Sequence, residues 1–247
     1  MNKIKVLSAN QLKIIAAVTM LIDHIGMIFL PNVLILRLIG RLSFPIFAFM
    51  ISEGAKYTKN KLKYLLTIAG VGVGWQALQI LLIGDFTLNI LLTFTMSIVI
   101  IYMLDLLKRI FFDKREIVIK KIAFILIFVV VALAPYILSK VFSWFDYSYG
   151  FSGCLSAVFA SAPCFNKTKA PSWLKKLDNI PVRLACMAIP MLIYSVAHGW
   201  AQFVCFVSFI LLLFYSEKRG TANLKYFFYV FYPAHLTVLY IIYLLIH

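Results

Sequence analysis

The stretch "LKIIAAVTMLIDHIG", residues 12–26, decides the fold class of this chain. A mostly apolar run is interrupted near its end by two adjacent ionisable residues, Asp23 and His24. A helix of about 20 mostly apolar residues crosses the roughly 30 Å hydrocarbon core of a bilayer. The stretch therefore predicts a membrane-spanning helix that carries two titratable side chains at depth.

The composition of the whole chain supports the same class. Of its 247 residues, 63% are hydrophobic and 13% are charged, and the mean hydropathy is +0.96. These values lie outside the range of soluble domains and predict an all-α polytopic integral membrane protein. Long apolar runs recur throughout, so we expect one transmembrane domain over residues 1–247. The first helix follows a basic segment without a small-residue cleavage pattern, and we expect it to be retained.

Nine segments are apolar enough to be candidate spans, and the distribution of charges orients them. Lys and Arg concentrate in the cytoplasmic loops of membrane proteins. With a cytoplasmic N-terminus and an outside C-terminus, 21 of the 24 Lys and Arg residues lie on the inner side, the exceptions being Arg37, Arg41 and Lys140. We therefore expect nine transmembrane helices in a bacterial inner membrane, near residues 12–30, 33–52, 62–83, 86–107, 119–138, 150–163, 181–196, 200–215 and 225–246.

The net charge of +15 has the same explanation. Basic inner loops face anionic lipid, so the charge does not indicate nucleic-acid binding, and the lipid bilayer is the expected partner. The four cysteines are widely spaced and show neither a CxxC pair nor a disulfide framework. We expect no metal site.

Ionisable residues within membrane segments are candidate functional residues, because burying a charge in lipid is costly. His24 lies about 18 Å from the inner end of the first helix, and Arg41 lies about 12 Å below the outer end of the second, which places them at similar depth. Arg37 is one turn from Arg41 on the same helix face. Asp23 and His24 point about 100° apart, so we expect one of them to contact Arg41 and the other to face a cavity.

Lys13 and His24 share one face of the first helix. They are 11 residues apart, which is about three turns and about 16 Å. A cation at the cytoplasmic end is thus aligned with an imidazole deep in the membrane, and the pantetheine arm of coenzyme A has a comparable length. Further polar residues lie in other segments: His235, which could reach the same cavity, Tyr232, which is an interfacial or a cavity residue, Asn89, for which an interhelical hydrogen bond is favoured over a pocket role, and Glu53 at the inner end of the second segment.

Four segments of the chain together resemble the TraX family, named for the protein that N-acetylates conjugative pilin. They are "LKIIAAVTMLIDHIG", "RLIGRLSFPIFAFMISEG", "LNILLTF" and "KYFFYVFYPAHLTVLY", in this order over nearly the whole chain. The TraX family in turn resembles a branch of the transmembrane acyltransferases, which share a basic residue and a His separated by ten residues in the first helix. Lys13 and His24 match that pattern.

The resemblance implies an acetyl-CoA-dependent acetyltransferase with His24 as the catalytic histidine and Lys13 on the coenzyme A path. His24 would act as general base or as nucleophile, with Asp23 as its neighbour. Arg41 would stabilise the oxyanion or hold Asp23. Other residues that fall in matching motifs are Glu53, Asn89, Tyr232 and His235. The segment "DYSYGFSG" matches only partly and "YSEKRG" departs from the family pattern, so the acceptor is open between a pilin-like protein N-terminus and a cell-surface glycan.

A proton-coupled small-molecule transporter is the alternative function. Asp, His and Arg residues in broken helices also form ion and proton pathways, and here they would be Asp23, His24 and Arg41. Such transporters are commonly built from inverted repeats, which the two halves of this sequence do not show. Flux in the absence of acetyl-CoA would distinguish this function from acetyl transfer.

Overall fold

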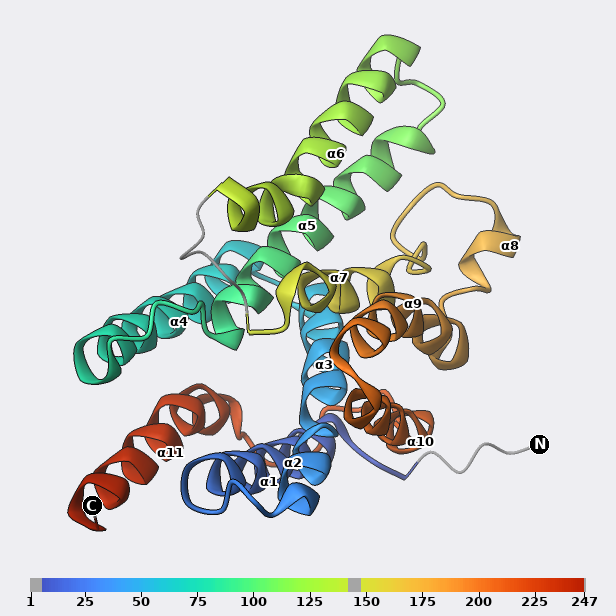
Figure 1. The fold of residues 1–247 in the computed structure, drawn as a ribbon. Helices are drawn as coiled ribbons and strands as arrows, with labels where there is room; N and C mark the ends of the chain where they lie inside the picture. Colours follow the sequence, from blue (N-terminus) through green and yellow to red (C-terminus); the bar gives the residue numbers. More distant parts are fainter. Residues whose placement is uncertain (1–5, 142–147, 247) are drawn as a thin grey trace. The chain divides into compact units, whose positions relative to one another are not determined.

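The structure is a computed structural model that describes residues 6–141 and 148–246. The described residues are helical apart from turns, loops and an isolated β-bridge between Leu7 and Tyr215 (Figure 1). The helices in chain order are α1 (Ala9–Phe29), α2 (Leu34–Gly40), α3 (Ser43–Tyr57), α4 (Lys61–Ile83), α5 (Ile90–Phe111), α6 (Val118–Val141), α7 (Gly150–Ser161), α8 (Ser172–Lys175), α9 (Ile180–His198), the 3-10 helix η1 (Trp200–Phe206), α10 (Val207–Leu213) and α11 (Lys225–Ile246).

Seven helical segments in the described part of the chain are long and apolar enough to cross a membrane. Two shorter apolar segments, Gly150–Ser161 and Trp200–Leu213, lie at the sixth and eighth predicted spans. The all-helical, multi-pass membrane class is therefore confirmed. The count of nine spans and the cytoplasmic N-terminus stay predictions, and Lys3 and Lys5, which contribute to that orientation, lie outside the described residues. Asp146 and Tyr147 of the partly matching "DYSYGFSG" also lie outside them.

By its internal contacts the chain divides into two compact units, Met1–Met50 with Ser195–His247 and Ile51–Tyr194. We call them unit 1 and unit 2. The expectation of one domain over residues 1–247 stays a prediction.

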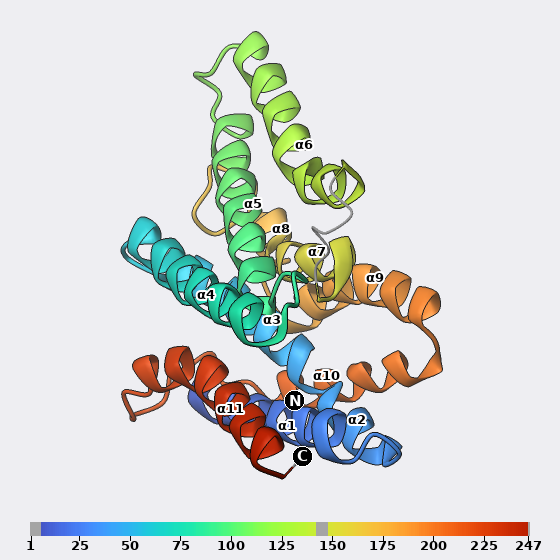
Figure 2. The same ribbon diagram turned by 60° about the vertical axis from the view of Figure 1, so that its left-hand side comes forward.

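In unit 1, α1 packs against α2 and against α11 (Figures 1 and 2). Helix α1 begins with a capping box, in which the Ser8 hydroxyl accepts from the Gln11 amide and the Gln11 side chain accepts from the Ser8 amide. This reciprocal pair satisfies two of the amide groups that a helix N-terminus leaves free. The segment before the helix is held by the chain before α11, because the Leu7 amide donates to the Phe214 carbonyl at 3.0 Å and the Ser216 amide donates to the Leu7 carbonyl at 2.8 Å.

Helices α1 and α11 run parallel. Their side-chain contacts follow one another in the same order along both helices: Lys13 with Phe228, His24 with His235, and Phe29 with Tyr243. Two parallel spans cross a membrane in the same direction, so the total number of spans is odd if both helices cross. Seven and nine spans both meet this condition.

The second predicted span is broken in the structure. Helix α2 ends at Gly40, a turn follows at residues 41–42, and α3 begins at Ser43, whose hydroxyl donates to the Gly40 carbonyl at 2.8 Å. Pro45 lies one turn after Arg41 and has no amide hydrogen to donate to the Arg41 carbonyl, so its position in the sequence predicts that the helix opens near Arg41, where the break lies. In the structure Pro45 belongs to the first turn of α3, where its missing amide hydrogen is tolerated.

In unit 2, α5 packs against α4, α6 and α7. Asn60 and Asn89 cap α4 and α5 with their side-chain oxygens, and α4 ends at Gly84 with a φ of +69°, a left-handed conformation that glycine adopts without strain. Only 6% of the apolar window in α6 is buried within the protein. Most of that helix is therefore available to lipid.

Candidate functional site

The structure brings His24 and His235 into direct contact within unit 1. The two residues are 211 positions apart in the sequence, yet His24 Nδ1 lies 2.8 Å from His235 Nε2. Their ring centroids are 5.0 Å apart. Both side chains were expected to reach one cavity, and packing of α1 against α11 places them together.

His235 is held by its own helix. Its Nδ1 lies 2.7 Å from the Phe231 carbonyl oxygen, one turn earlier on α11. The Phe231 ring stacks on the imidazole at 4.8 Å, and the Tyr232 ring meets its edge at 5.9 Å. Tyr232, predicted as either an interfacial or a cavity residue, thus lies beside the histidine pair. Residues 6–141 and 148–246 contain no cluster of three or more His, Cys, Asp or Glu side chains arranged for a metal.

Lys13 and His24 both face α11, as their spacing predicts. The Lys13 ammonium lies 5.6 Å from the centre of the Phe228 ring, within the range of a cation–π contact. Phe228 is near the start of α11 and His235 lies two turns further along. The same pair of helices therefore carries a cation at its beginning and the two imidazoles at its centre.

Asp23 pairs with Arg37 of α2. Arg37 Nη1 lies 2.8 Å from Asp23 Oδ1, and the side chains are 27% and 13% exposed. The sequence favoured Arg41 as the contact of Asp23 or His24, but Arg41 follows the end of α2 at the turn. Its buried Nε has no hydrogen-bond partner among the residues described. Asp23 and His24 have different partners, as expected for adjacent residues of a helix.

Gly40 allows the close approach of α2 to the Asp23 side chain. A Cβ atom at position 40 would overlap Asp23, and one at Gly26 would lie 2.7 Å from the Leu36 Cβ. We expect Gly40→Ala to destabilise the protein by about 1–3 kcal/mol, the usual cost of overpacking. Thermal unfolding in one detergent measures this effect.

Gly74→Ala is the matched control. A Cβ there would meet no atom within 4 Å, and alanine is about 1 kcal/mol more favourable than glycine inside a helix. Its unfolding midpoint should be unchanged or higher. Equal midpoints for the two variants would contradict the close approach of α1 and α2.

Glu53 and Asn89 belong to unit 2, whereas His24 belongs to unit 1. Glu53 forms an ion pair with Arg183. Asn89 Nδ2 donates to the Gly72 carbonyl at 2.8 Å and to Gln76 Oε1 at 3.0 Å, while its side-chain oxygen caps α5. Through these contacts both residues stabilise the packing within unit 2. Their position in a substrate pocket stays a prediction.

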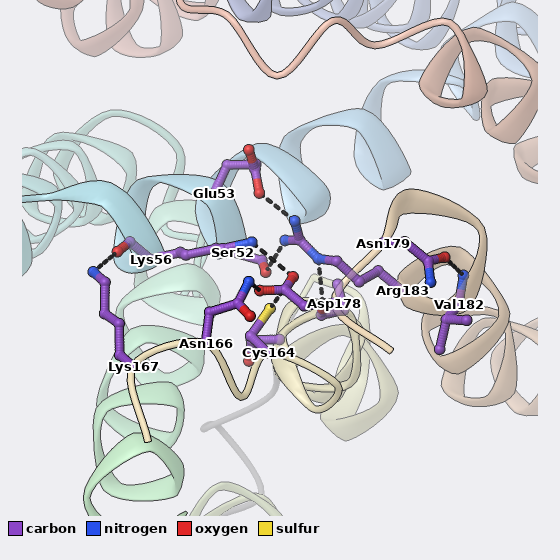
Figure 3. Close-up of polar contacts among 12 residues, drawn as sticks. Ser52, Glu53, Lys56, Cys164, Asn166, Lys167, Asp178, Asn179, Val182 and Arg183 are labelled. Carbon is purple, nitrogen blue, oxygen red and sulfur yellow. Dashed lines mark hydrogen bonds and ion pairs between the residues drawn. The ribbon is translucent and has the colours of Figure 1, made fainter. Parts of the chain in front are cut away.

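The buried charges of unit 2 are the residues that sequence reasoning missed (Figure 3). Arg183, counted with the basic residues of the inner side, lies in α9 with 2% exposure. Its Nη2 donates to the Ser52 hydroxyl and its Nε to the Ala160 carbonyl, both at 2.9 Å. Lys108 donates to the Ser161 carbonyl at 3.0 Å. Two cations thus bind carbonyls at the C-terminal end of α7, where the helix dipole favours positive charge.

Asp178, near Arg183, accepts three hydrogen bonds from other side chains of unit 2. Its carboxylate accepts from Lys56 Nζ at 2.7 Å, from Asn166 Nδ2 at 2.7 Å and from the Cys164 thiol at 3.3 Å. A signal for the location of Arg183 was present in "DNIPVR", because Asn179 accepts from the Val182 amide at 3.1 Å and caps the beginning of α9. An N-cap at Asn179 places Arg183 inside the helix.

We expect the Cys164 thiol to react slowly in the folded protein. Burial raises the pKa of this thiol from 9.0 to about 11 and outweighs the effect of the nearby cations Arg183 and Lys56. The reactive form is the thiolate, and two pKa units reduce its fraction about 100-fold at pH 8. In a variant with the other three cysteines replaced by alanine, maleimide should label the folded protein about 100-fold more slowly than the protein unfolded in SDS. The rate should rise with pH up to about 11, and equal rates in the two states would contradict the burial.

Comparison with known proteins agrees with the sequence resemblance. The family described as TraX protein matches residues 8–243. The chain is also 39% identical over 70 residues to the probable fimbrial assembly protein FimC of Dichelobacter nodosus, a match that covers 27% of this chain and 29% of that protein. No solved structure matches the chain. Because the family match extends over nearly the whole sequence and includes both histidines of the pair, the chain belongs to the TraX family.

Proposed function

We propose that this protein is a membrane-embedded acetyltransferase that transfers an acetyl group from cytosolic acetyl-CoA to an acceptor amine or hydroxyl. The observation that carries the proposal is the arrangement along α1 and α11, where Lys13 and His24 face the same partner helix about 16 Å apart. An imidazole at membrane depth supplies a base or nucleophile. A cation at the end of the same face suits the phosphates of coenzyme A.

The chain around Lys13 supports the donor end of this proposal. The Ala9 amide donates to the Lys218 carbonyl at 2.8 Å, and the Asn10 amide donates to the Arg219 carbonyl at 3.1 Å. The loop that carries Lys218 and Arg219 is therefore held against the beginning of α1, one turn before Lys13. Three cationic residues, Lys13, Lys218 and Arg219, thus belong to adjoining segments, and their positive charge favours phosphate.

His24 could take part in acetyl transfer in two ways, as a general base or as a nucleophile. When His24 acts as general base, it takes the proton of the acceptor amine or hydroxyl as the acceptor attacks the thioester carbonyl. The carbon–sulfur bond then breaks, and the thiolate of coenzyme A takes that proton. When His24 acts as nucleophile, its Nε2 attacks the thioester carbonyl, the carbon–sulfur bond breaks and coenzyme A leaves as its thiolate. The acceptor then attacks the acetyl group on His24, the carbon–nitrogen bond breaks, and the freed Nε2 takes the acceptor's proton and releases it to water. Arg41, whose buried Nε has no hydrogen-bond partner in the described residues, is the expected donor to the oxyanion.

The acceptor we favour is the N-terminus of a pilin-like protein, because the D. nodosus relative is described as a fimbrial assembly protein. A cell-surface glycan is the other acceptor, and a bacterial inner membrane is the proposed location. The test is acetyl transfer by purified protein in proteoliposomes from radiolabelled acetyl-CoA to a pilin N-terminal peptide or to a glycan fraction. Substrate flux without acetyl-CoA, combined with no transfer, would overturn the proposal in favour of a transporter based on Asp23, His24 and Arg41.

Lys13→Ala should weaken the binding of acetyl-CoA more than the chemical step. We expect KM for acetyl-CoA to rise about tenfold, equivalent to about 1.4 kcal/mol, with little change in kcat. Steady-state kinetics in proteoliposomes measure both constants, and Lys59→Ala, which removes an exposed lysine of unit 2, is the control. An unchanged KM would remove Lys13 from the donor site.

A further inference from the structure

We propose that His235 is a positioning residue that fixes the tautomer of His24 and thereby makes His24 Nε2 the reactive nitrogen. This inference rests on the proposed acetyl transfer. It follows from two hydrogen bonds in series: His24 Nδ1 to His235 Nε2 at 2.8 Å, and His235 Nδ1 to the Phe231 carbonyl at 2.7 Å.

The Phe231 carbonyl, at the end of the series, determines which atom donates in each of the two hydrogen bonds. A carbonyl oxygen only accepts hydrogen bonds, so His235 Nδ1 carries the hydrogen and donates it to Phe231. A neutral imidazole has one N–H, which leaves Nε2 of His235 as an acceptor. His24 Nδ1 must then be the donor, and the lone pair of neutral His24 lies on Nε2.

The surroundings of His235 keep this direction constant. Its ring bonds to the carbonyl one turn earlier, the direction in which helical side chains point, and the Phe231 ring stacked at 4.8 Å restricts its rotation. Side chain and carbonyl belong to the same helix, so small shifts between α1 and α11 leave the bond to Phe231 intact. The tautomer of His235, and through it that of His24, is set within α11.

The same chain of bonds assists proton transfer. When His24 Nε2 takes the acceptor proton, the ring becomes an imidazolium, and its Nδ1–H bond to His235 becomes charge-assisted and stronger. In serine hydrolase triads a carboxylate holds the catalytic histidine in this way. Here the nearby carboxylate is unavailable for that role, because Asp23 is paired with Arg37 at 2.8 Å. A neutral imidazole orients His24 without placing another negative charge in the membrane.

Nitrogen NMR on the ¹⁵N-histidine-labelled protein in lipid bilayers tests the tautomer directly. The chain has four histidines, and the signals of His24 are assigned by their loss in His24→Gln. We expect the wild type, without any substrate, to show a protonated Nδ1 and an unprotonated Nε2 on His24. A protonated Nε2 in the neutral His24 ring would overturn the inference.

Three variants separate positioning from packing. In His235→Gln the side-chain oxygen replaces the accepting Nε2, so we expect the His24 tautomer to persist and kcat to remain within about tenfold of wild type. In His235→Leu no acceptor remains, and in His235→Asn the shorter side chain reaches Phe231 but not His24. For these two we expect His24 to shift towards the Nε2–H tautomer and kcat to fall about 10²–10⁴-fold, with KM for acetyl-CoA little changed.

The outcomes distinguish this inference from the proposed function. Equal activity of the Gln and Leu variants, or retention of the wild-type tautomer in both, would overturn the positioning role even if acetyl transfer is confirmed. The expected tautomer in a wild-type protein that transfers no acetyl group would overturn the proposed function and support the hydrogen-bond direction. Because the tautomer is read from the wild-type protein without substrate, and His24→Gln serves only to assign the signals, the inference is tested in either case.

Discussion

Replacing His24 by alanine is expected to reduce kcat for acetyl transfer about 10²–10⁴-fold, the usual contribution of a general base. The variant removes an imidazole that combines a position within a predicted span, alignment with Lys13 and a hydrogen bond to a second histidine. The measurement is transfer of label from acetyl-CoA in proteoliposomes that contain equal amounts of each protein. Full activity of His24→Ala would contradict the proposed mechanism.

Two controls show whether a loss of activity in His24→Ala comes from the missing catalytic group or from a misfolded protein. His198→Ala removes an exposed imidazole at the end of α9, and its activity should equal that of the wild type. The unfolding midpoint of His24→Ala should stay close to the wild-type value, because the second hydrogen bond of the series, from His235 to the Phe231 carbonyl, remains within α11. A large fall in the midpoint would instead assign His24 a structural role.

Arg183→Met should cause the largest loss of stability among the substitutions considered. The guanidinium binds Glu53, Ser52 and the Ala160 carbonyl while only 2% exposed. Removing one partner of a buried ion pair costs about 3–5 kcal/mol, because the other charge is left unpaired. Unfolding in detergent followed by fluorescence or protease resistance measures the effect. The matched control is Arg109→Met, which removes an exposed arginine near the end of α5 and should change stability by less than about 0.5 kcal/mol.

A double variant tests whether the loss comes from the unpaired carboxylate. In Glu53→Leu with Arg183→Met both charges are absent, and replacement of a whole buried pair by apolar side chains is often neutral. We therefore expect the double variant to be more stable than Arg183→Met alone. If the two losses simply add, Glu53 and Arg183 do not act as a pair.

Much of the architecture was predictable because lipid imposes strict rules on a sequence. A span must be a long apolar helix, since unpaired backbone groups are too costly in hydrocarbon. The predicted segments near residues 62–83, 119–138 and 225–246 accordingly match α4, α6 and α11 closely. The break at residues 41–42 also has a local signal, because Pro45 has no amide hydrogen for the Arg41 carbonyl one turn earlier.

The candidate site was predictable only as far as helix periodicity extends. The period of 3.6 residues places Lys13 and His24 on one face of α1 and separates Asp23 from His24, and both expectations agree with their contacts. Arg183 and Lys108 were counted with the basic residues of the inner side, because each lies at the edge of a predicted apolar segment. Their burial depends on carbonyls at the end of α7, which no local pattern in the chain reveals.

The sequence by itself thus determined the membrane class, the helices and the residues that share a face, because each follows from local composition and a fixed helical period. Only the tertiary structure decided which residue each buried polar group contacts. It paired Asp23 with Arg37 rather than Arg41 and joined His24 to His235 across 211 residues. The physical reason is that such a choice depends on which helices pack together, how closely Gly40 lets α2 approach α1, and where α2 ends.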